Sequence, residues 1–235
     1  MIQTQIVIPC FNELDGLLSL IDECLRVVEL SSNSLGFILV NNGSNDGSEQ
    51  IFNGVIGQYP NIEIVNLPVN QGYGGGILAG LESSNAQIIG WTHADLQTPL
   101  IDCLEASQTI EAGYSFVKGW RKGRPISDRI FSGGMGLFES VLFGSRLEEV
   151  NAQPTLFTRN FFERWQNPPT DFSLDLYALV MAVRNGSKIQ RMKVEFLPRQ
   201  FGQSKWNMGF KSRVKFIRRT IKYSLELRKS LHEDI

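Results

Sequence analysis

Two polar residues with metal-ligand spacing follow a run that predicts a buried strand: Asp95 and Gln97. If that stretch is extended, both side chains lie on the same side of the chain. Carboxylate and amide oxygens are ligands that Mg²⁺ and Mn²⁺ favour, so the pair predicts a divalent-cation site. His93 could add a nitrogen ligand. The alternative is that Asp95 caps a helix that begins near Pro99.

Two further segments are candidates for binding phosphate. Glycines from Gly72 to Gly76 permit close backbone approach, and free N–H groups at a helix start bind anions. The stretch lacks the spacing of a dinucleotide site or a P-loop, so a plain turn fits it equally well. Farther along, Arg199, Ser204 and Lys205 suit a basic loop that closes over phosphates. A solvated basic loop is the alternative.

The pattern of predicted elements brings these segments together. Strand-like and helix-like runs alternate up to residue 92, which is typical of a parallel sheet with helices on both faces. Right-handed crossovers place the carboxyl ends of such strands at one edge, where ligands bind. We expect strands at 5–9, 37–40, 62–66, 88–92, 116–120 and 189–197, and helices at 14–30, 49–56, 77–81, 132–143, 171–184 and 206–231.

Composition limits the classes of protein that this chain can belong to. Its 235 residues, 42% of them hydrophobic, suffice for one large α/β domain, and the formal net charge of −1 gives no global attraction to nucleic acid. Three cysteines without paired spacing predict reduced thiols in the cytoplasm. The sequence predicts neither a signal peptide nor a membrane-spanning run, so we expect any membrane contact to be peripheral.

The C-terminal region has a different charge from the rest of the chain. Nine Lys or Arg residues and a single acid lie between residues 205 and 229. A basic amphipathic helix of this kind suits an anionic membrane surface, but its apolar stripe could equally pack on the sheet. The apolar positions at near-helical spacing are Phe210, Val214, Ile217, Ile221, Leu225 and Leu227.

Five segments carry a family resemblance when taken in order. They read IVIPCFNE at 6–13, VNNGSNDGS at 40–48, NQGYGGGILAG at 70–80, ADLQTP at 94–99 and RQFGQSK at 199–205. Together they resemble the family 2 glycosyltransferases of GT-A fold, and among these the polyprenyl-phosphate sugar transferases of the dolichol-phosphate mannose synthase type. The matches span nearly the whole chain.

The resemblance implies a role for each matching residue, and the cofactor Mg²⁺ or Mn²⁺. The donor nucleotide would be bound by Pro9, Phe11, Glu13, Asn42, Asp46, Gly72, Gly74, Asp95 and Ser204. The metal would be held by Asp95 and Gln97, with His93 as a further candidate. The transfer itself would involve Asp95, Arg199, Lys205 and Arg121, the last near the acceptor phosphate together with Arg129.

The sequence also departs from the family pattern. Asn41-Asn42 stands where the family has two Asp residues, and His93 replaces the first Asp of an Asp-x-Asp motif. The usual general-base acid is missing from 151–157. Asp171 and Asp175 could replace it, although a helix cap and a surface acid are the simpler interpretation. A missing base fits a phosphate acceptor better than a hydroxyl, because an anionic oxygen needs no strong base.

We therefore expect a GT-A catalytic domain at 1–205, with a nucleotide-binding half at 1–115 and an acceptor half at 116–205, followed by a basic amphipathic tail at 206–235. The expected reaction moves a sugar from a nucleotide-diphosphate sugar to a polyprenyl phosphate at the cytoplasmic membrane face. A saccharide hydroxyl as acceptor, or a degenerate binding module without turnover, are the alternatives. We expect no nucleic-acid partner, and leave open an anionic membrane surface, a membrane protein partner and an oligomer.

Overall fold

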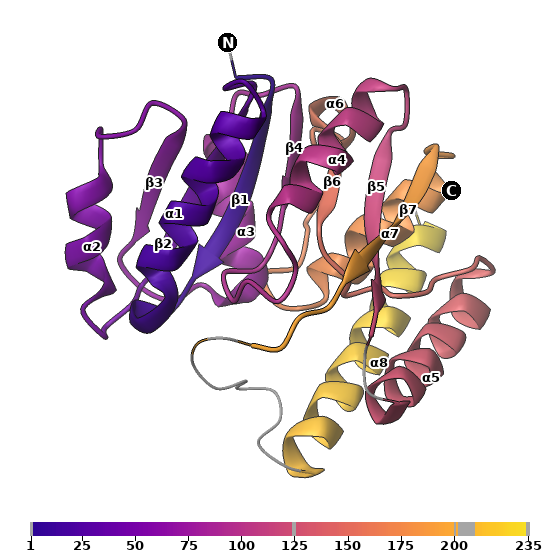
Figure 1. Ribbon diagram of the computed structural model, residues 1–235. Coiled ribbons are helices and arrows are strands. Elements are labelled where there is room, and N and C mark those ends of the chain that lie inside the picture. The colour runs from indigo at the N-terminus through magenta and orange to yellow at the C-terminus, as the bar shows by residue number, and fades with distance from the viewer. Residues whose placement is uncertain (1, 124–125, 200, 202–209, 234–235) are drawn as a thin grey trace.

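A single mixed sheet organises the chain in the computed structural model, which describes residues 2–123, 126–199, 201 and 210–233 (Figure 1). The strands are β1 Thr4–Cys10, β2 Leu35–Asn42, β3 Ile62–Leu67, β4 Ile88–Trp91, β5 Phe116–Lys122, β6 Thr155–Thr158 and β7 Ile189–Glu195. The helices are α1 Leu14–Leu30, α2 Ser48–Val55, α3 Gly72–Ser83, α4 Ile101–Glu111, α5 Ile126–Phe143, α6 Arg159–Phe162, α7 Leu174–Arg184 and α8 Phe210–Glu233.

The sheet confirms the mostly parallel arrangement that the sequence predicts. The described strands follow the order β3-β2-β1-β4-β6-β5-β7. β6 pairs antiparallel with both β4 and β5, and the other pairs are parallel. The sequence analysis missed β6, because four residues show too little periodicity to identify a strand. A helix beginning near Pro99 is expected only as the alternative interpretation of Asp95, and α4 Ile101–Glu111 lies there.

Strand side chains alternate between two helical layers. Ile6 and Ile8 of β1 join a core cluster with α1, α2 and α4 on one face. Val7 joins a second cluster with α3, α6 and α7 on the other face. Both faces of β1 are therefore covered, which explains its continuous apolar run. The carboxyl ends of β1, β2 and β4 lie at the same edge of the sheet (Figure 1).

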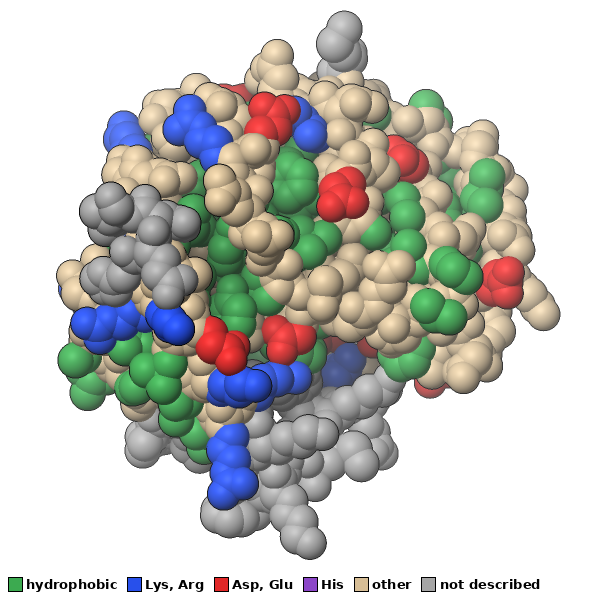
Figure 2. Space-filling model, turned by 180° about the vertical axis from the view of Figure 1, so that it is seen from behind, with side chains coloured by type: hydrophobic (Ala, Val, Ile, Leu, Met, Phe, Trp, Pro, Cys, Tyr) green, Lys and Arg blue, Asp and Glu red, His purple; other side chains and the backbone are tan. Residues whose placement is uncertain are grey.

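The C-terminal helix α8 lies beside α5 and packs partly on the domain (Figure 1). Ser224 and Leu227 are buried, and Leu227 joins the core cluster of α7. Leu225 is 51% exposed, so it does not belong to the packed stripe that the sequence predicts. Seen from behind, Lys and Arg side chains gather on the half of the surface that carries α8, whereas the opposite half shows scattered acidic and hydrophobic side chains (Figure 2).

None of the helices within the described ranges combines the length and apolar character that crossing a membrane requires. The N-terminal end of the tail, residues 206–209, lies outside the described residues, as do the side chains at 210–216.

Candidate functional site

Three charged side chains from distant segments meet at the carboxyl edge of the sheet. Glu13 follows β1, Asp95 follows β4, and Arg199 follows β7. The Arg199 guanidinium lies 3.7 Å from the Glu13 carboxylate and 3.9 Å from the Asp95 carboxylate. Its Nε donates a hydrogen bond to the Phe201 carbonyl. The convergence that parallel topology predicts is thus present for these residues.

The segment after β4 is a turn, so the extended geometry expected for Asp95 and Gln97 is wrong. Leu96 has a φ of 54°, and the Gln97 N–H donates to the Asp95 carboxylate. The Gln97 side chain donates to the Leu197 carbonyl at 3.1 Å, and the Leu197 N–H donates to the Gln97 carbonyl at 2.8 Å. Gln97 therefore holds the segment that carries Arg199 against the Asp95 turn.

A small cavity of about 270 Å³ opens beside this grouping, lined by Glu13, Asp46 and Phe201 among others. The Asp46 carboxylate accepts from the Leu14 N–H at the start of α1 and from the N–H and hydroxyl of Ser48 at the start of α2. Partial burial raises the pKa of Asp46, but these hydrogen bonds outweigh it and leave the pKa below its usual value.

The first residues expected at the base pocket lie at the end of β1. Pro9 is the penultimate residue of β1 and pairs with Val40 of β2. Phe11 follows the strand and is half-buried. Asn12, with a φ of 56°, exchanges hydrogen bonds with Asn45, which joins the loops after β1 and β2.

The Asn42 side chain is hydrogen-bonded to the backbone at the start of α3. Its amide donates to the Gly72 carbonyl at 2.8 Å and accepts from the Gln71 N–H at 2.9 Å. The side chain is buried, with 3% exposed. Only an amide can donate and accept in this way, so the structure gives a reason for Asn where the family pattern has Asp.

The backbone of residues 169–171 packs closely against glycines at the start of α3. A Cβ at Gly74 would lie 2.6 Å from the Asp171 carbonyl oxygen, and one at Gly72 would lie 2.7 Å from that of Thr170. The Gly75 N–H donates to the same Thr170 carbonyl at 2.8 Å. Close approach at these glycines thus serves the 169–171 segment, and one of the N–H groups expected for phosphate is already paired.

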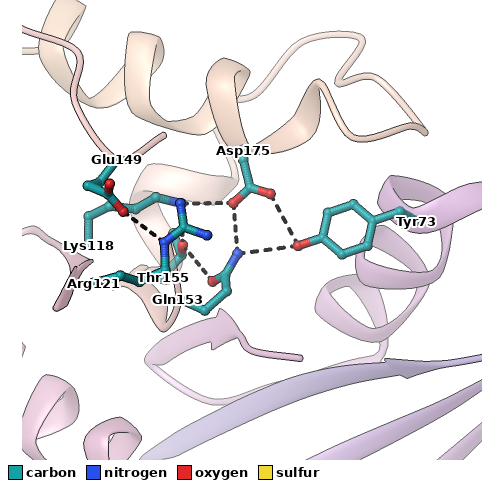
Figure 3. Close-up of polar contacts among 7 residues, drawn as sticks. All are labelled: Tyr73, Lys118, Arg121, Glu149, Gln153, Thr155 and Asp175. Carbon is teal, nitrogen blue, oxygen red and sulfur yellow. Dashed lines mark hydrogen bonds and ion pairs between the residues drawn. The ribbon is translucent and has the colours of Figure 1, made fainter. Parts of the chain in front are cut away.

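A buried ion pair lies within the predicted acceptor half, and Tyr73 links it to the predicted nucleotide-binding half (Figure 3). Lys118 of β5 lies 2.7 Å from Asp175 of α7, with side-chain exposures of 0% and 2%. Lys118 also donates to Thr155, while Gln153 and the Tyr73 hydroxyl donate to Asp175. Burial lowers the pKa of Lys118 to about 8, although Asp175 acts in the opposite direction. Each buried charge therefore has hydrogen-bonding partners.

These contacts correct the simpler interpretation of the two acids. Asp175 is not a surface acid, because it is fully enclosed with Lys118. Asp171 precedes α7 and accepts from the Ser173 N–H, in keeping with the predicted cap. Its second oxygen lies 3.2 Å from Arg219 of α8, which ties the tail to the domain.

His93 lies between the two charge groupings. Its ring centroid is 5.7 Å from that of Tyr73, whose other neighbour is a stacked Phe172 ring at 4.4 Å. Burial lowers the pKa of His93, and the nearby Asp95 and Asp175 only partly oppose this. The imidazole is therefore neutral near pH 7.

Arg121 lies at the mouth of a groove of about 660 Å³ between β5 and α5. Its Nε donates to the Glu149 carboxylate at 2.7 Å. Trp120, Lys122 and Arg146 also line this groove. Lys205 and Ser204 lie outside the described residues, and so does the side chain of Arg129.

Sequence reasoning missed the partners that organise this site: Lys118, Gln153, Thr155, Tyr73 and Glu149. One signal was present. Lys118 lies inside the apolar run of β5, and a charge in such a strand needs a partner. Nothing in the sequence identified which acid that partner would be.

Among the described residues, no three His, Cys, Asp or Glu side chains group into a metal site. The Asp95 and Glu13 carboxylates nevertheless share one cationic group, Arg199. The position therefore attracts positive charge, and a divalent ion fits there if further oxygen ligands come from a bound molecule.

Comparisons with known proteins agree with this architecture. The family described as Glycosyl transferase family 2 matches residues 5–172. Over 127 residues the chain is 31% identical to undecaprenyl-phosphate 4-deoxy-4-formamido-L-arabinose transferase from Yersinia pestis (strain Pestoides F), and to the same enzyme from Yersinia pseudotuberculosis. The match covers 53% of this chain and only 38% of the relative.

Solved structures show the same fold. Glucosyl-3-phosphoglycerate synthase from Mycobacterium tuberculosis, in complex with Mn²⁺, UDP and phosphoglyceric acid, superposes with a TM-score of 0.70 at 17% identity. It covers 96% of this chain and 78% of that chain. A complex of the same synthase with Mg²⁺ and UDP also gives 0.70. This likeness confirms the predicted GT-A fold.

Proposed function

Because the chain belongs to glycosyl transferase family 2, we propose that it transfers a sugar from a nucleotide-diphosphate sugar to a polyprenyl phosphate. The observation that carries the proposal is the meeting of Glu13, Asp95 and Arg199 at one sheet edge. Two carboxylates and one guanidinium can bind a cation and a diphosphate side by side, which is what departure of a nucleoside diphosphate requires.

In this proposal Asp95 holds Mg²⁺ or Mn²⁺ through its carboxylate, and the donor diphosphate supplies further oxygens. The ion would neutralise charge on the leaving diphosphate. Arg199 lies within reach of the same position and would contact the phosphates, while Gln97 fixes the Arg199 segment. Gln97 and His93 stay candidate ligands. The crystallised mycobacterial synthase, which binds UDP with Mn²⁺ or Mg²⁺, supports this arrangement.

The contacts of Asp175 and Asp171 support the choice of acceptor. Asp175 is enclosed with Lys118, and Asp171 contacts Arg219 and the Ser173 N–H. Neither is placed to remove a proton from a sugar hydroxyl. A phosphate oxygen is already anionic and needs no such base, so these contacts favour a lipid phosphate over a saccharide hydroxyl.

The groove at β5 and α5 is the proposed acceptor site. Arg121, Lys122 and Arg146 line it together with Glu148 and Glu149, which pair with Arg146 and Arg121, so the lining keeps an excess of one positive charge. Leu137 of its rim is 68% exposed, and Val141, one turn later, is 75% exposed. A groove with cations and an exposed apolar ridge suits a phosphate joined to a hydrocarbon chain.

A lipid acceptor requires the protein to work at a membrane surface, and we propose the cytoplasmic face. Exposed cations of α8 support this placement: Arg218, Lys222, Arg228 and Lys229. Cations near an anionic leaflet contribute about 1 kcal/mol each to binding. Vesicle sedimentation should show binding that rises with the fraction of phosphatidylglycerol, and equal binding to neutral vesicles would contradict the placement.

The direct test is Asp95→Ala with Mn²⁺ and a panel of nucleotide-diphosphate sugars. We expect transfer to undecaprenyl phosphate to fall by at least ~100-fold, because the charge that holds the cation is lost. The cation-dependent rise in melting temperature with a nucleoside diphosphate should disappear as well. Asp22→Ala is the matched control, since Asp22 is an exposed carboxylate on α1.

Three outcomes separate the alternatives. Unchanged transfer in Asp95→Ala would remove the metal assignment. Nucleotide binding without transfer to any acceptor would identify a degenerate binding module. Transfer to a saccharide but not to the lipid phosphate would establish the hydroxyl alternative.

A further inference from the structure

A stack of side chains runs from the tail helix to the candidate cation site. The Arg219 guanidinium of α8 lies 5.6 Å from the Phe172 ring centre. Phe172 stacks on Tyr73 at 4.4 Å with an angle of 5° between the planes. Tyr73 in turn lies 5.7 Å from the His93 ring. His93 is two residues before Asp95, so the stack ends at the turn that carries this carboxylate.

Tyr73 is the fixed member of this stack. Its hydroxyl donates to the Asp175 carboxylate at 3.1 Å and accepts from the Gln153 amide at 3.2 Å (Figure 3). Asp175 is itself held by Lys118. The hydroxyl end of the ring is therefore anchored in the buried network, while Phe172 and His93 lie against the ring.

The backbone around Tyr73 is equally constrained. Gly72 and Gly74, on either side of it, admit the carbonyls of the 169–171 segment at distances that no Cβ tolerates. The Gly75 N–H donates to Thr170 in the same contact. The ring thus has little freedom to move, which is what a group that orients a ligand-binding side chain requires.

We propose that Tyr73 is a positioning residue for the cation site: its ring sets the place of His93 and, through it, of the Asp95 turn. The inference deepens the proposed function and rests on it for the assignment of Asp95. It assigns no contact with substrate to Tyr73. The ring, rather than the hydroxyl, makes the contact with His93, and the hydroxyl anchors the ring.

The test compares Mn²⁺ affinity with thermal stability in three variants. Tyr73→Leu removes the ring, and we expect Mn²⁺ to bind ~10-fold more weakly, as is usual when a residue supporting a metal ligand is lost. Tyr73→Phe keeps the ring and should retain Mn²⁺ affinity within about twofold, although the melting temperature falls. Tyr59→Leu removes a partly buried tyrosine that packs on the opposite core cluster, and should lower only the melting temperature.

Mn²⁺ binding is measured by electron paramagnetic resonance of the free ion, with and without a nucleoside diphosphate that can supply further oxygen ligands, so no turnover is needed. A Tyr73→Leu protein with wild-type Mn²⁺ affinity would overturn the inference, as would an equal loss of affinity in Tyr59→Leu. If Tyr73→Leu does not fold, Phe172→Leu removes the neighbouring ring while keeping the Tyr73 hydrogen bonds. It should weaken Mn²⁺ binding in the same direction, and an unchanged affinity there would also overturn the inference.

The same experiment separates this inference from the proposed function. If the wild-type protein binds Mn²⁺ but neither UDP nor GDP raises its melting temperature, the proposed transferase function loses its support. The comparison of the Tyr73 variants still decides the positioning role in that case. If the wild-type protein binds no Mn²⁺ even when a nucleoside diphosphate is present, both the cation assignment and the positioning role are wrong.

Discussion

The Lys118–Asp175 pair and the grouping of Arg199 with Glu13 and Asp95 differ in burial and in distance. Lys118 and Asp175 are 2.7 Å apart with 0% and 2% of their side chains exposed. Arg199 lies 3.7 and 3.9 Å from Glu13 and Asp95, with exposures between 18% and 26%. Charge-assisted hydrogen bonds are typically about 2.7–2.9 Å long, so only the first grouping is fully formed.

The difference indicates two kinds of role. A buried pair with complete hydrogen bonding fixes the structure around it, because separating the charges leaves one of them unpaired in the interior. A partly exposed and long contact is easily exchanged for another partner. The Lys118 pair therefore suits a scaffold, and the Arg199 grouping suits a site where ligands bind.

The largest expected loss of stability comes from breaking the buried Lys118–Asp175 pair. Lys118→Met leaves the Asp175 carboxylate unpaired, and we expect it to lower the free energy of unfolding by about 3–5 kcal/mol. Arg199→Gln, at the exposed grouping, should lower it by less than about 1 kcal/mol. Urea unfolding of the two variants measures both. Lys118→Met with Asp175→Asn, which removes the charge and keeps an acceptor for Tyr73 and Gln153, should recover most of the loss. Equal losses at the two groupings would contradict the comparison.

A smaller effect is expected at Asn42, where a neutral buried side chain holds α3. Asn42→Asp loses the donor to the Gly72 carbonyl and places a carboxylate against it. We expect the free energy of unfolding to fall by about 1–3 kcal/mol. Asn45→Asp is the control, because the exposed Asn45 side chain only accepts from Asn12 and a carboxylate can do the same. A stable Asn42→Asp variant would show that the amide is not needed.

The smallest effect concerns Asp46, which is partly exposed. Because its pKa is lowered in the folded protein, its contribution to stability is present above the unfolded pKa of about 3.9 and is lost as the pH falls through the folded pKa. Thermal melts of wild type and Asp46→Asn should differ at pH 7, by less than about 1 kcal/mol, and converge below about pH 4. A difference between the two proteins that stays the same at pH 7 and at pH 3 would contradict the lowered pKa of Asp46.

Much of the fold could be predicted because its signals are local. The helix at 14–30 matches α1 to the residue, and the early strands have continuous apolar runs. β6 could not be found, because its place between β4 and β5 depends on pairing with residues far away in the sequence. Individual backbone angles could not be predicted either: no pattern in the sequence indicates that Leu96 has a φ of 54°.

The site was predictable in its location and less so in its contacts. Parallel topology brings the segments that carry Glu13 and Asp95 to one edge, whereas Arg199 was named from the basic residues after a predicted strand and from the family resemblance. The hydrogen-bonding and ion-pair partners across the core could not be named, because packing of distant segments decides that Lys118 pairs with Asp175. The roles expected for Gly72 and Gly74 depended on which backbone approaches them, and that too is a tertiary contact.

The antiparallel strand β6 has a practical consequence for chimeras of this protein. β4 pairs with β1 on one side and with β6 on the other. A graft of residues 1–115 alone would leave β4 with an open edge, and such an edge recruits other chains. A chimera between relatives therefore depends on whether the host's strand at this place can pair with β4 as Thr155–Thr158 does.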